Sequence, residues 1–429
     1  MTLHDVTLEV PELGIAMIGS GLMAKSHTMG YRNVESVYGT TPFRPRFRVL
    51  ADAKEDLARS GAESLGYEAW TVDWREAVTD PVVDVVDIVT PNFLHKEIAL
   101  AAIAAGKHVY CEKPLAVTAV DAKEMYEAAE AAGVKTLVGF NYLRNPAIAE
   151  ARRLIAGGAL GDIWTFSGQF VLDACTDPDV AFTWRFDRKL SGSGALGDLG
   201  AHIVSLAHVL VGPISSVAGL SRTFVTSRPE PIGTFGYSSG ADLQAPRHEV
   251  ENDDATTFLI EFASGASGHI EASRVSTGRT WHQRVEVVGS KGALQFVQQD
   301  IHTLRLYLTG DPVERKGYRE IELGPAHGDY GAFWPFAGVP LGVHELKTIE
   351  VHEWLDALST GRRPDGDFYE GWQVCEVLDA VERSASERRW VDITPPPPHD
   401  EAALTRRRRM RLNQAVATSS RPSGRVGTR

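Results

Sequence analysis

The sequence has few cysteines and no long hydrophobic run. Its three cysteines, at positions 111, 175 and 375 of 429 residues, are odd in number and far apart, which excludes a disulfide framework and a CxxC metal or redox motif. No apolar stretch approaches the roughly 20 residues that cross a bilayer. Because no basic segment followed by an apolar one precedes residue 13, we expect no export signal. We therefore expect a cytoplasmic protein that does not enter the membrane.

Charge is distributed unevenly along the chain. Charged residues make up 23% and hydrophobic residues 43%, a composition typical of a globular protein. The net charge is −12, yet from Glu401 onward eight arginines accompany one acidic residue. An arginine run can bind nucleic acid, but an acidic body repels a phosphate backbone. We therefore predict a disordered Arg-rich tail over residues 396–429 and expect no nucleic-acid partner.

Short apolar strands alternate with helical patterns in the first third of the chain. After a lead of residues 1–12, the sequence predicts strands at 14–18, 48–51, 85–89, 108–111 and 136–140, with helices such as 96–105 and 119–132 between them. This order predicts an α/β domain over residues 13–140, a Rossmann fold with a doubly wound parallel sheet. Residues 38–47 contain two prolines and are interpreted as an insertion before the second strand.

The pattern changes after residue 140. Apolar and polar residues alternate at 163–172, 256–262, 268–275, 284–288 and 304–308, and helices are predicted at 146–156, 199–210 and 348–358. Over residues 141–395 we therefore predict an α+β domain with a large, mostly antiparallel open sheet. The stretches 233–252 and 324–342 are predicted as irregular loops. Aromatic residues in the second loop favour a lid or a subunit contact.

A glycine pair follows the first predicted strand. The apolar run 13–18 leads into Gly19-Ser20-Gly21-Leu22-Met23, where a helical pattern begins. Gly19 permits a tight turn, Gly21 leaves backbone N–H groups accessible, and the helix that starts at Leu22 and Met23 directs its N-terminus at an anion. This pattern predicts a dinucleotide-binding site.

Polar residues at the ends of the next two strands fall on the same edge of the sheet. Asp52 follows the second strand, where a carboxylate binds the ribose of NAD and repels the 2′-phosphate of NADP. A surface helix cap is the alternative for Asp52. Thr90, Asn92 and His95 lie in the loop after the third strand, where doubly wound folds contact ligands, although Asn92 could serve only as a helix cap. We therefore expect NAD as the cofactor rather than NADP.

Residues suited to acid–base chemistry occur at two places. Glu112 and Lys113 follow the strand at 108–111 and are expected at the cofactor site, where Lys113 can stabilise negative charge on a substrate oxygen. Their spacing fits a structural ion pair equally well. Asp198 and His202 are four residues apart in a predicted helix, and the carboxylate is expected to raise the pKa of His202 above about 6.5. The pair could bind a metal, but no third ligand and no HExxH motif accompanies it, so no metal is expected.

Taken in order, these motifs resemble those of the Gfo/Idh/MocA family of oxidoreductases. The resemblance runs over residues 13–393 and rests on the glycine turn, on Glu112-Lys113-Pro114 and on the stretch 191–202. It implies that Lys113, Asp198 and His202 act together on a sugar or polyol. It also implies that the open sheet forms a homodimer or homotetramer.

Finer features resemble family members that oxidise a ring hydroxyl of a sugar, anhydrosugar or glycoside. The stretches 141–144, 184–186 and 191–198 carry this likeness. It implies that Trp184 and Arg185 contact the cofactor and that Tyr142 and Arg185 join the three catalytic residues at the substrate. Residues 172–177 contain no aromatic side chain, which an anhydrosugar enzyme of this kind is expected to have there.

We therefore predict an NAD-dependent sugar dehydrogenase. His202 takes the hydroxyl proton, Lys113 orients the hydroxyl, and Asp198 orients His202. An inositol dehydrogenase is the alternative within the same class. A non-catalytic dinucleotide-binding sensor is the alternative from another class, and the three intact catalytic residues argue against it. A redox-cycled hydrolysis or isomerisation would leave the same pattern in the sequence.

Overall fold

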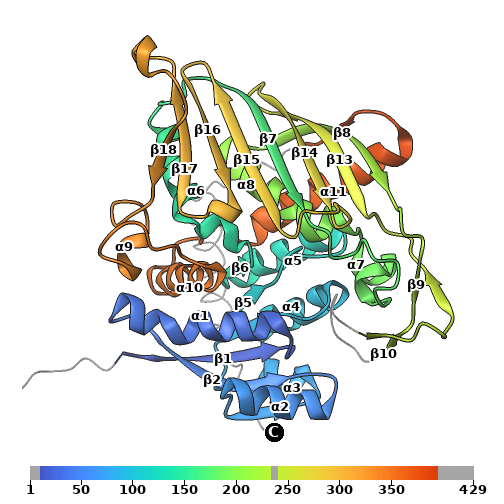
Figure 1. Ribbon diagram of the computed structural model, residues 1–429. Coiled ribbons are helices and arrows are strands. Elements are labelled where there is room, and N and C mark those ends of the chain that lie inside the picture. Colours follow the sequence, from blue (N-terminus) through green and yellow to red (C-terminus); the bar gives the residue numbers. More distant parts are fainter. Residues whose placement is uncertain (1–9, 233–239, 395–429) are drawn as a thin grey trace, which may run out of the picture. The chain divides into compact units, whose positions relative to one another are not determined.

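Six short parallel strands form the first sheet of the computed structural model, which describes residues 10–232 and 240–394 (Figure 1). The predicted lead up to residue 9 and the predicted tail lie outside the described residues. The sheet order is β3-β2-β1-β4-β5-β6, with the reversal beside β1 that defines a doubly wound fold. The strands are β1 (Glu12–Ile18), β2 (Arg44–Ala51), β3 (Ala69–Thr71), β4 (Val85–Ile88), β5 (His108–Cys111) and β6 (Thr136–Val138). The helices and turns are α1 (Leu22–Tyr38), α2 (Glu55–Leu65), α3 (Trp74–Thr79), η1 (Asn92–Leu94), α4 (His95–Ala104), α5 (Ala119–Ala132) and η2 (Asn141–Arg144).

The predicted insertion at residues 38–47 is wrong. Helix α1 continues to Tyr38, and β2 already begins at Arg44, so only a short loop separates them. Pro45 is tolerated inside β2 because β3 pairs only with the later residues 49–51, which leaves the start of β2 at an open edge. The long distance from the glycine turn to Asp52 therefore comes from the 17 residues of α1.

A second sheet has nine strands in the order β18-β17-β16-β15-β7-β14-β13-β8-β19. All neighbours pair antiparallel except β7 and β14, which are parallel, so the predicted mostly antiparallel sheet is confirmed. The strands are β7 (Ile163–Val171), β8 (Ile214–Arg222), β13 (Ala255–Phe262), β14 (Ser267–Ser273), β15 (His282–Gly289), β16 (Gly292–Val297), β17 (Thr303–Leu308), β18 (Arg319–Glu322) and β19 (Val391–Asp392).

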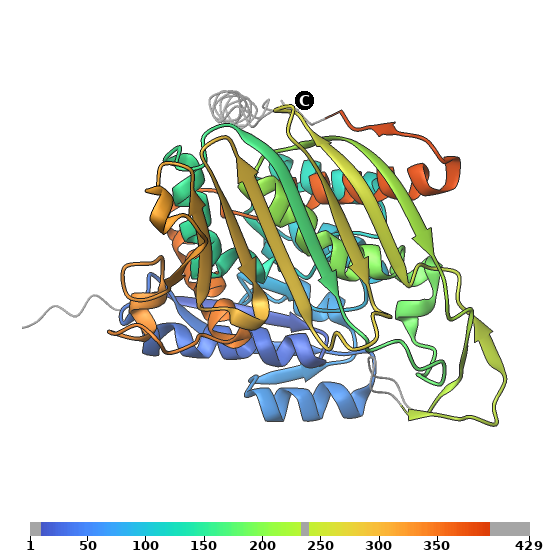
Figure 2. The same ribbon diagram turned by 45° about the horizontal axis from the view of Figure 1, so that its top comes forward.

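Among the described elements, helices cover only one face of the large sheet, and Figure 2 shows the strands in front with helices behind them. Helices α8 and α11 pack on this covered face. Helix α10, which the chain reaches after the large sheet, packs against α1 of the first domain. The helices and turns are α6 (Pro146–Ala156), η3 (Trp184–Phe186), α7 (Arg188–Ser191), η4 (Leu196–Gly200, a π-helical turn), α8 (Ala201–Leu210), η5 (Gln298–Asp300), η6 (Val313–Arg315), α9 (Tyr330–Phe333), α10 (Val343–Thr360) and α11 (Phe368–Glu387).

The two predicted loops contain short elements. In the described part of 233–252, Gly240–Ala241 (β11) pairs with Pro231–Ile232 (β10), and Arg247–Glu249 (β12) pairs with Ser227–Pro229 (β9). The loop at 324–342 carries α9.

The loop at 324–342 packs against the end of α1 that lies away from the glycine turn. The hydroxyl of Tyr38 donates to Asp329 at 3.0 Å, and its ring lies 6.1 Å from that of Phe333. Tyr38 ends helix α1, about 25 Å along the helix from Gly21 at the 1.5 Å rise of each residue. These contacts leave both the lid and the subunit contact as predictions for this loop.

Candidate active site

The glycine turn at the end of β1 is built to approach a ligand. Gly19 has a φ of 107°, and a Cβ at this position would lie 3.1 Å from the carbonyl oxygen of Val89, so glycine is required there. At Gly21, which precedes α1, an added Cβ would meet nothing within 4 Å. Leu22 is exposed and Met23 partly exposed. The open N-terminus of a long helix fits the pyrophosphate of a dinucleotide.

Asp52 lies beside this turn. Its Oδ2 accepts hydrogen bonds from the backbone N–H of Ser20 at 3.1 Å and from the Ser20 hydroxyl at 2.6 Å. The cap residue of α2 is Lys54, so Asp52 is not simply a cap of that helix. The structure therefore brings Asp52 to the predicted cofactor edge, and ribose binding stays a prediction.

The loop after β4 is tied to the loops around it. The side-chain amide of Asn92 donates to the carbonyl of Ser191 at 3.1 Å, which links the two domains. The ring nitrogens of His95 lie 3.0 Å from the carbonyl oxygens of Pro114 and Thr90. Both ring nitrogens of His95 are occupied by these backbone oxygens and its side chain is fully buried, so the predicted direct cofactor contact is corrected: this histidine holds the loops that carry Thr90 and Pro114.

Glu112 is anchored in a buried network of charges. Its Oε1 accepts from Nε2 of His27 at 2.9 Å and from Nζ of Lys347 at 3.1 Å, and its Oε2 accepts from the backbone N–H of Lys113 at 3.1 Å. A Cβ on Gly139 would lie 2.6 Å from Oε1, so only glycine leaves room for the carboxylate. Burial opposes ionisation, but the charge of Lys347 and the hydrogen bond from His27 hold the pKa of Glu112 well below its ordinary value.

The rest of this network was not predicted from the sequence. His27 Nδ1 pairs with Asp87 at 2.9 Å, and Lys347 Nζ pairs with Glu350 at 2.8 Å, all four side chains being fully buried. The sequence feature that could have indicated this network is a lysine and a glutamate, three residues apart, within the apolar stretch 346–351. The network joins α1, β4, β5 and α10, and it fixes the backbone that presents Lys113.

Lys113 of the first domain pairs with Asp198 of the second. Lys113 Nζ donates to Oδ1 of Asp198 at 2.9 Å and to the main-chain oxygen of Asp198 at 2.8 Å. Lys113 is 15% exposed and Asp198 30%, so both remain accessible to a small ligand. The sequence allowed Glu112 and Lys113 to form a structural ion pair. In the structure, Lys113 instead forms its ion pair with Asp198 of the second domain.

The turn that carries Asp198 is fixed by a residue that the sequence did not reveal. The carboxylate of Asp253 accepts from the backbone N–H groups of Gly194 at 2.6 Å and of Leu196 at 2.9 Å. A Cβ on Gly194 would lie only 2.0 Å from the carbonyl oxygen of Asp253. The glycine-rich stretch before Asp198 is therefore needed for close approach to this aspartate.

His202 follows on α8 and does not have the partner expected for it. The carboxylate of Asp198 binds Lys113, whereas Nδ1 of His202 is buried without a hydrogen-bond partner. Asp198 lies in the π-helical turn η4, and His202 lies in the helix α8 that follows it.

The predicted rise in the pKa of His202 is also wrong. Burial and the positive charge of Lys113 lower the pKa of His202 well below its ordinary value and outweigh the attraction of Asp198. The imidazole is therefore neutral near pH 7 and can accept a proton.

Aromatic rings surround His202. The ring centroid of Tyr142 lies 4.8 Å from that of His202, and those of Phe170 and Phe140 lie at 5.9 and 6.4 Å. Tyr142 is buried, which raises its pKa and keeps its hydroxyl protonated. The structure thus places Tyr142 beside His202, and its contact with the substrate stays a prediction.

Trp184 and Arg185 lie in the turn η3, next to a buried anchor. The guanidinium of Arg185 lies 4.4 Å from the ring centroid of Trp184. The next residue, Phe186, is held between the guanidinium groups of Arg228 and Arg274, at 4.3 and 4.5 Å from its ring centroid. These cation–π contacts fix the turn that presents Trp184 and Arg185.

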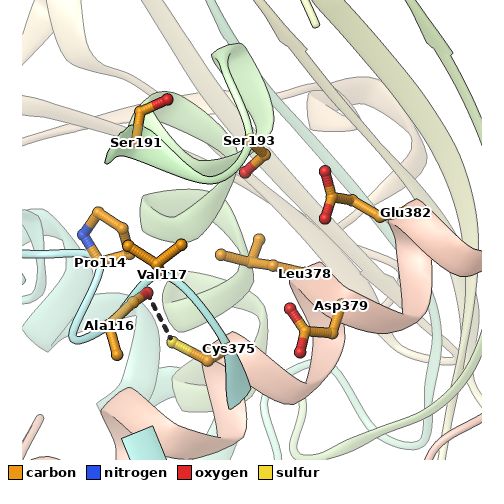
Figure 3. Close-up of a pocket in the computed structure, with 9 residues that line it drawn as sticks. All are labelled: Pro114, Ala116, Val117, Ser191, Ser193, Cys375, Leu378, Asp379 and Glu382. Atoms are coloured by element: carbon orange, nitrogen blue, oxygen red, sulfur yellow. Dashed lines mark hydrogen bonds between the residues drawn. The ribbon is translucent and has the colours of Figure 1, made fainter. Parts of the chain in front are cut away.

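A small pocket lies behind the Lys113 loop (Figure 3). Pro114 and Val117 form one side, Ser191 and Ser193 a second, and α11 closes it with side chains that include Asp379 and Glu382. Two carboxylates and no basic side chain line this pocket, so it does not suit the phosphates of a dinucleotide.

Over residues 10–232 and 240–394, no group of three or more His, Cys, Asp and Glu side chains could hold a metal ion. Within the same residues, the helices are too short or too polar to span a bilayer.

Comparisons with known proteins identify the family. A model of the oxidoreductase family with an NAD-binding Rossmann fold matches residues 13–140, and a model of the GFO/IDH/MocA C-terminal domain matches residues 148–295. The chain belongs to the Gfo/Idh/MocA family of oxidoreductases, and its first domain is an NAD-binding Rossmann domain.

Within this family, the chain is similar to several dehydrogenases of sugars and inositols. Levoglucosan dehydrogenase from Pseudarthrobacter phenanthrenivorans is 38% identical over 384 residues, which are 89% of this chain and 98% of that protein. The NAD(+)-dependent scyllo-inositol 2-dehydrogenase of Bacillus subtilis is 31% identical over 268 residues, 62% of this chain and 70% of that protein. A solved structure of levoglucosan dehydrogenase with NADH and levoglucosan matches with a TM-score of 0.84 and 37% identity, covering 89% of this chain and 99% of that one.

Proposed function

We propose that the protein oxidises a ring hydroxyl of a sugar, anhydrosugar or glycoside to a ketone, with NAD⁺ as the oxidant. The observation that carries this proposal is the accessible Lys113–Asp198 pair, whose Asp198 lies on the same helical segment as His202, a neutral histidine with an unpartnered ring nitrogen. The similarity to levoglucosan dehydrogenase over most of both chains supports the substrate class.

The residues at the carboxyl edge of the first sheet fit NAD. Gly19, Gly21, Leu22 and Met23 would face the pyrophosphate, and Asp52 the adenosine ribose, where its charge disfavours a 2′-phosphate. The remaining residues proposed to line the nicotinamide half are Thr90, Asn92, Glu112, Lys113, Trp184 and Arg185. When bound, NAD⁺ supplies the acceptor for the hydride that leaves the substrate carbon.

Lys113, Asp198 and His202 have different roles in removing the proton from the reacting hydroxyl. Lys113 donates a hydrogen bond to the reacting hydroxyl and stabilises negative charge that develops on its oxygen. Asp198 holds Nζ of Lys113 in place through the contact at 2.9 Å. His202, neutral near pH 7, accepts the hydroxyl proton as general base. Asp198 is thus proposed to position Lys113 rather than His202.

An inositol is the second candidate substrate. The similarity to scyllo-inositol 2-dehydrogenase favours it, and a cyclic polyol presents the same secondary hydroxyls as a sugar ring. The same three residues serve either substrate.

We also propose a homodimer or homotetramer that assembles through the open face of the large sheet. Leu220 and Leu259, 52% and 53% exposed, lie on neighbouring strands of that face. The three cysteines are free and buried, which suits the reducing cytoplasm proposed as the compartment.

The test is NADH formation with a panel of sugars, anhydrosugars, glycosides and inositols, followed at 340 nm. Turnover with a pyranose or its anhydride supports the proposal, and identification of the ketone product establishes the oxidised position. Turnover restricted to inositols would favour the second candidate. NADH binding with no oxidation of any panel member would favour the non-catalytic sensor.

A further inference from the structure

Gln283 occupies a position on β15 where an apolar residue is expected. The odd-numbered residues of β15 from 283 to 289 are buried, so Gln283 points to the helix-covered face together with Val285 and Val287. Its strand lies between β7 and β16 in the middle of the large sheet. A glutamine in this row interrupts a hydrophobic layer.

The sheet register places Gln283 beside the aromatic residues that surround His202. Gln283 pairs with Phe170 of β7, and side chains that oppose each other on one sheet face have Cβ atoms about 4.5–5.5 Å apart. The ring of Phe170 contacts His202, at 5.9 Å between centroids, and Trp281 at 5.5 Å. Gln283 is therefore one side chain away from the proposed general base.

The amide of Gln283 has nothing to bind within the described protein. Its side chain is fully buried, and both Oε1 and Nε2 lack a hydrogen-bond partner. Gln298, which follows the strand opposite Gln283, is buried with its Oε1 also unpartnered. Buried amides without partners cost folding free energy and are rare in native proteins. These atoms must therefore be matched by a ligand or by water.

We propose that Gln283 is a substrate-binding residue, whose Nε2 donates to one ring hydroxyl and whose Oε1 accepts from another. A polyhydroxylated ring suits this amide because each hydroxyl both donates and accepts. Trp281, 46% exposed and in contact with Phe170, would provide the apolar wall at the rim of the same site. Gln283 then determines which hydroxyl pattern is accepted, since a site built to bind a hydroxyl rejects analogues that lack it.

The inference rests on the proposed sugar dehydrogenase activity, and Gln283→Met tests it. Methionine has a similar length but no hydrogen-bonding amide. We expect kcat/KM for the best sugar to fall at least tenfold, mainly through KM, while the affinity for NADH is unchanged. The thermal midpoint should stay the same or rise, because an unpaired buried polar group is removed.

Gln295→Met is the matched control. Gln295 lies on the neighbouring strand β16 but on the other face of the sheet, where its amide donates to Glu286 at 2.7 Å. This control should keep the wild-type kinetic constants. Kinetic constants of Gln283→Met equal to those of wild type would overturn the inference and leave water as the partner of the amide.

Two further measurements keep the outcomes separate. If Gln283→Met does not fold, Gln283→Asn keeps the amide but withdraws it by one methylene, and the same loss in kcat/KM is expected. If wild type oxidises no sugar, calorimetric binding of the same panel to the NADH complex still tests the subsite. Binding that Gln283→Met abolishes would support the subsite although the proposed reaction had failed. Neither oxidation nor binding by wild type would overturn both proposals.

Discussion

Glu112 and His202, the buried groups on the two sides of Lys113, differ in how their polar atoms are paired. On the Rossmann side, Glu112 is bonded to His27 and Lys347, and these in turn to Asp87 and Glu350. On the side of the large sheet, His202 and Gln283 are equally buried, but Nδ1 of His202 and the whole amide of Gln283 have no partner.

The two histidines show the consequence of this difference. Burial opposes protonation of both, yet the carboxylates of Asp87 and Glu112 raise the pKa of His27 above its ordinary value. Burial and the Lys113 charge leave the pKa of His202 far below it. The paired groups around Glu112 hold the backbone of Lys113, whereas the unpaired atoms of His202 and Gln283 are the ones proposed to meet the substrate.

The largest expected effect is on the unsatisfied side, in His202→Ala. A positioned general base contributes about 10²–10⁴ in rate, so kcat should fall by that factor while NADH still binds. His208→Ala is the control, because His208 lies on the same helix but pairs with Glu370 at 3.1 Å. Steady-state kinetics and NADH fluorescence measure both properties. Near-normal turnover of His202→Ala would remove it as the base and leave Lys113 as the proton acceptor.

On the satisfied side, Lys347→Met should mainly reduce stability. Removal of one partner from a buried charge network leaves uncompensated carboxylates and costs about 3–5 kcal/mol. Lys96→Met, which breaks a surface contact with Asp121, should cost about 1 kcal/mol or less. Urea unfolding of both variants measures the difference. Equal losses would mean that the network around Glu112 is no more critical than a surface ion pair.

Asp52→Ser tests the cofactor side of the cleft. The Asp52 carboxylate should disfavour the 2′-phosphate of NADP, so wild type should prefer NAD. Loss of the charge should narrow the ratio of kcat/KM between the two cofactors at least tenfold, which corresponds to about 1.4 kcal/mol. A wild type that uses NADP as well as NAD would contradict this assignment before any mutant is made.

The smallest expected effect is on the pH dependence of kcat/KM. Since the base form of His202 is the neutral one and its pKa is lowered, the acidic limb of kcat/KM for sugar oxidation should have its midpoint below pH 6.5. Between pH 6.5 and 8 the deprotonation of His202 should add nothing further to the rate. A midpoint above pH 7 would instead indicate that a bound ligand or Asp198 restores a raised pKa.

Several elements of the fold follow from the sequence because their causes are local. Strand β5 and helix α5 are found at the predicted bounds, since apolar runs and helical periodicity depend on neighbouring residues. The glycine turn could be predicted for the same reason, because Gly19 needs its positive φ whatever packs around it. The predicted insertion at 38–47 was wrong because its prolines were taken to exclude a strand. Pro45 is tolerated in β2 since it lies at an open edge of the sheet, and only the sheet order shows this.

The sequence alone indicated that Lys113 and Asp198 belong to the candidate site. Lys113 follows a predicted strand, and Asp198 follows a glycine-rich stretch. Only the tertiary structure decided which side chains form pairs. Asp198 pairs with Lys113, 85 positions away, and Lys347 pairs with Glu112, 235 positions away. It also decided the charge of His202 and left Gln283 without a partner. Partner choice and burial depend on packing between distant segments, and no local pattern in the chain encodes that packing.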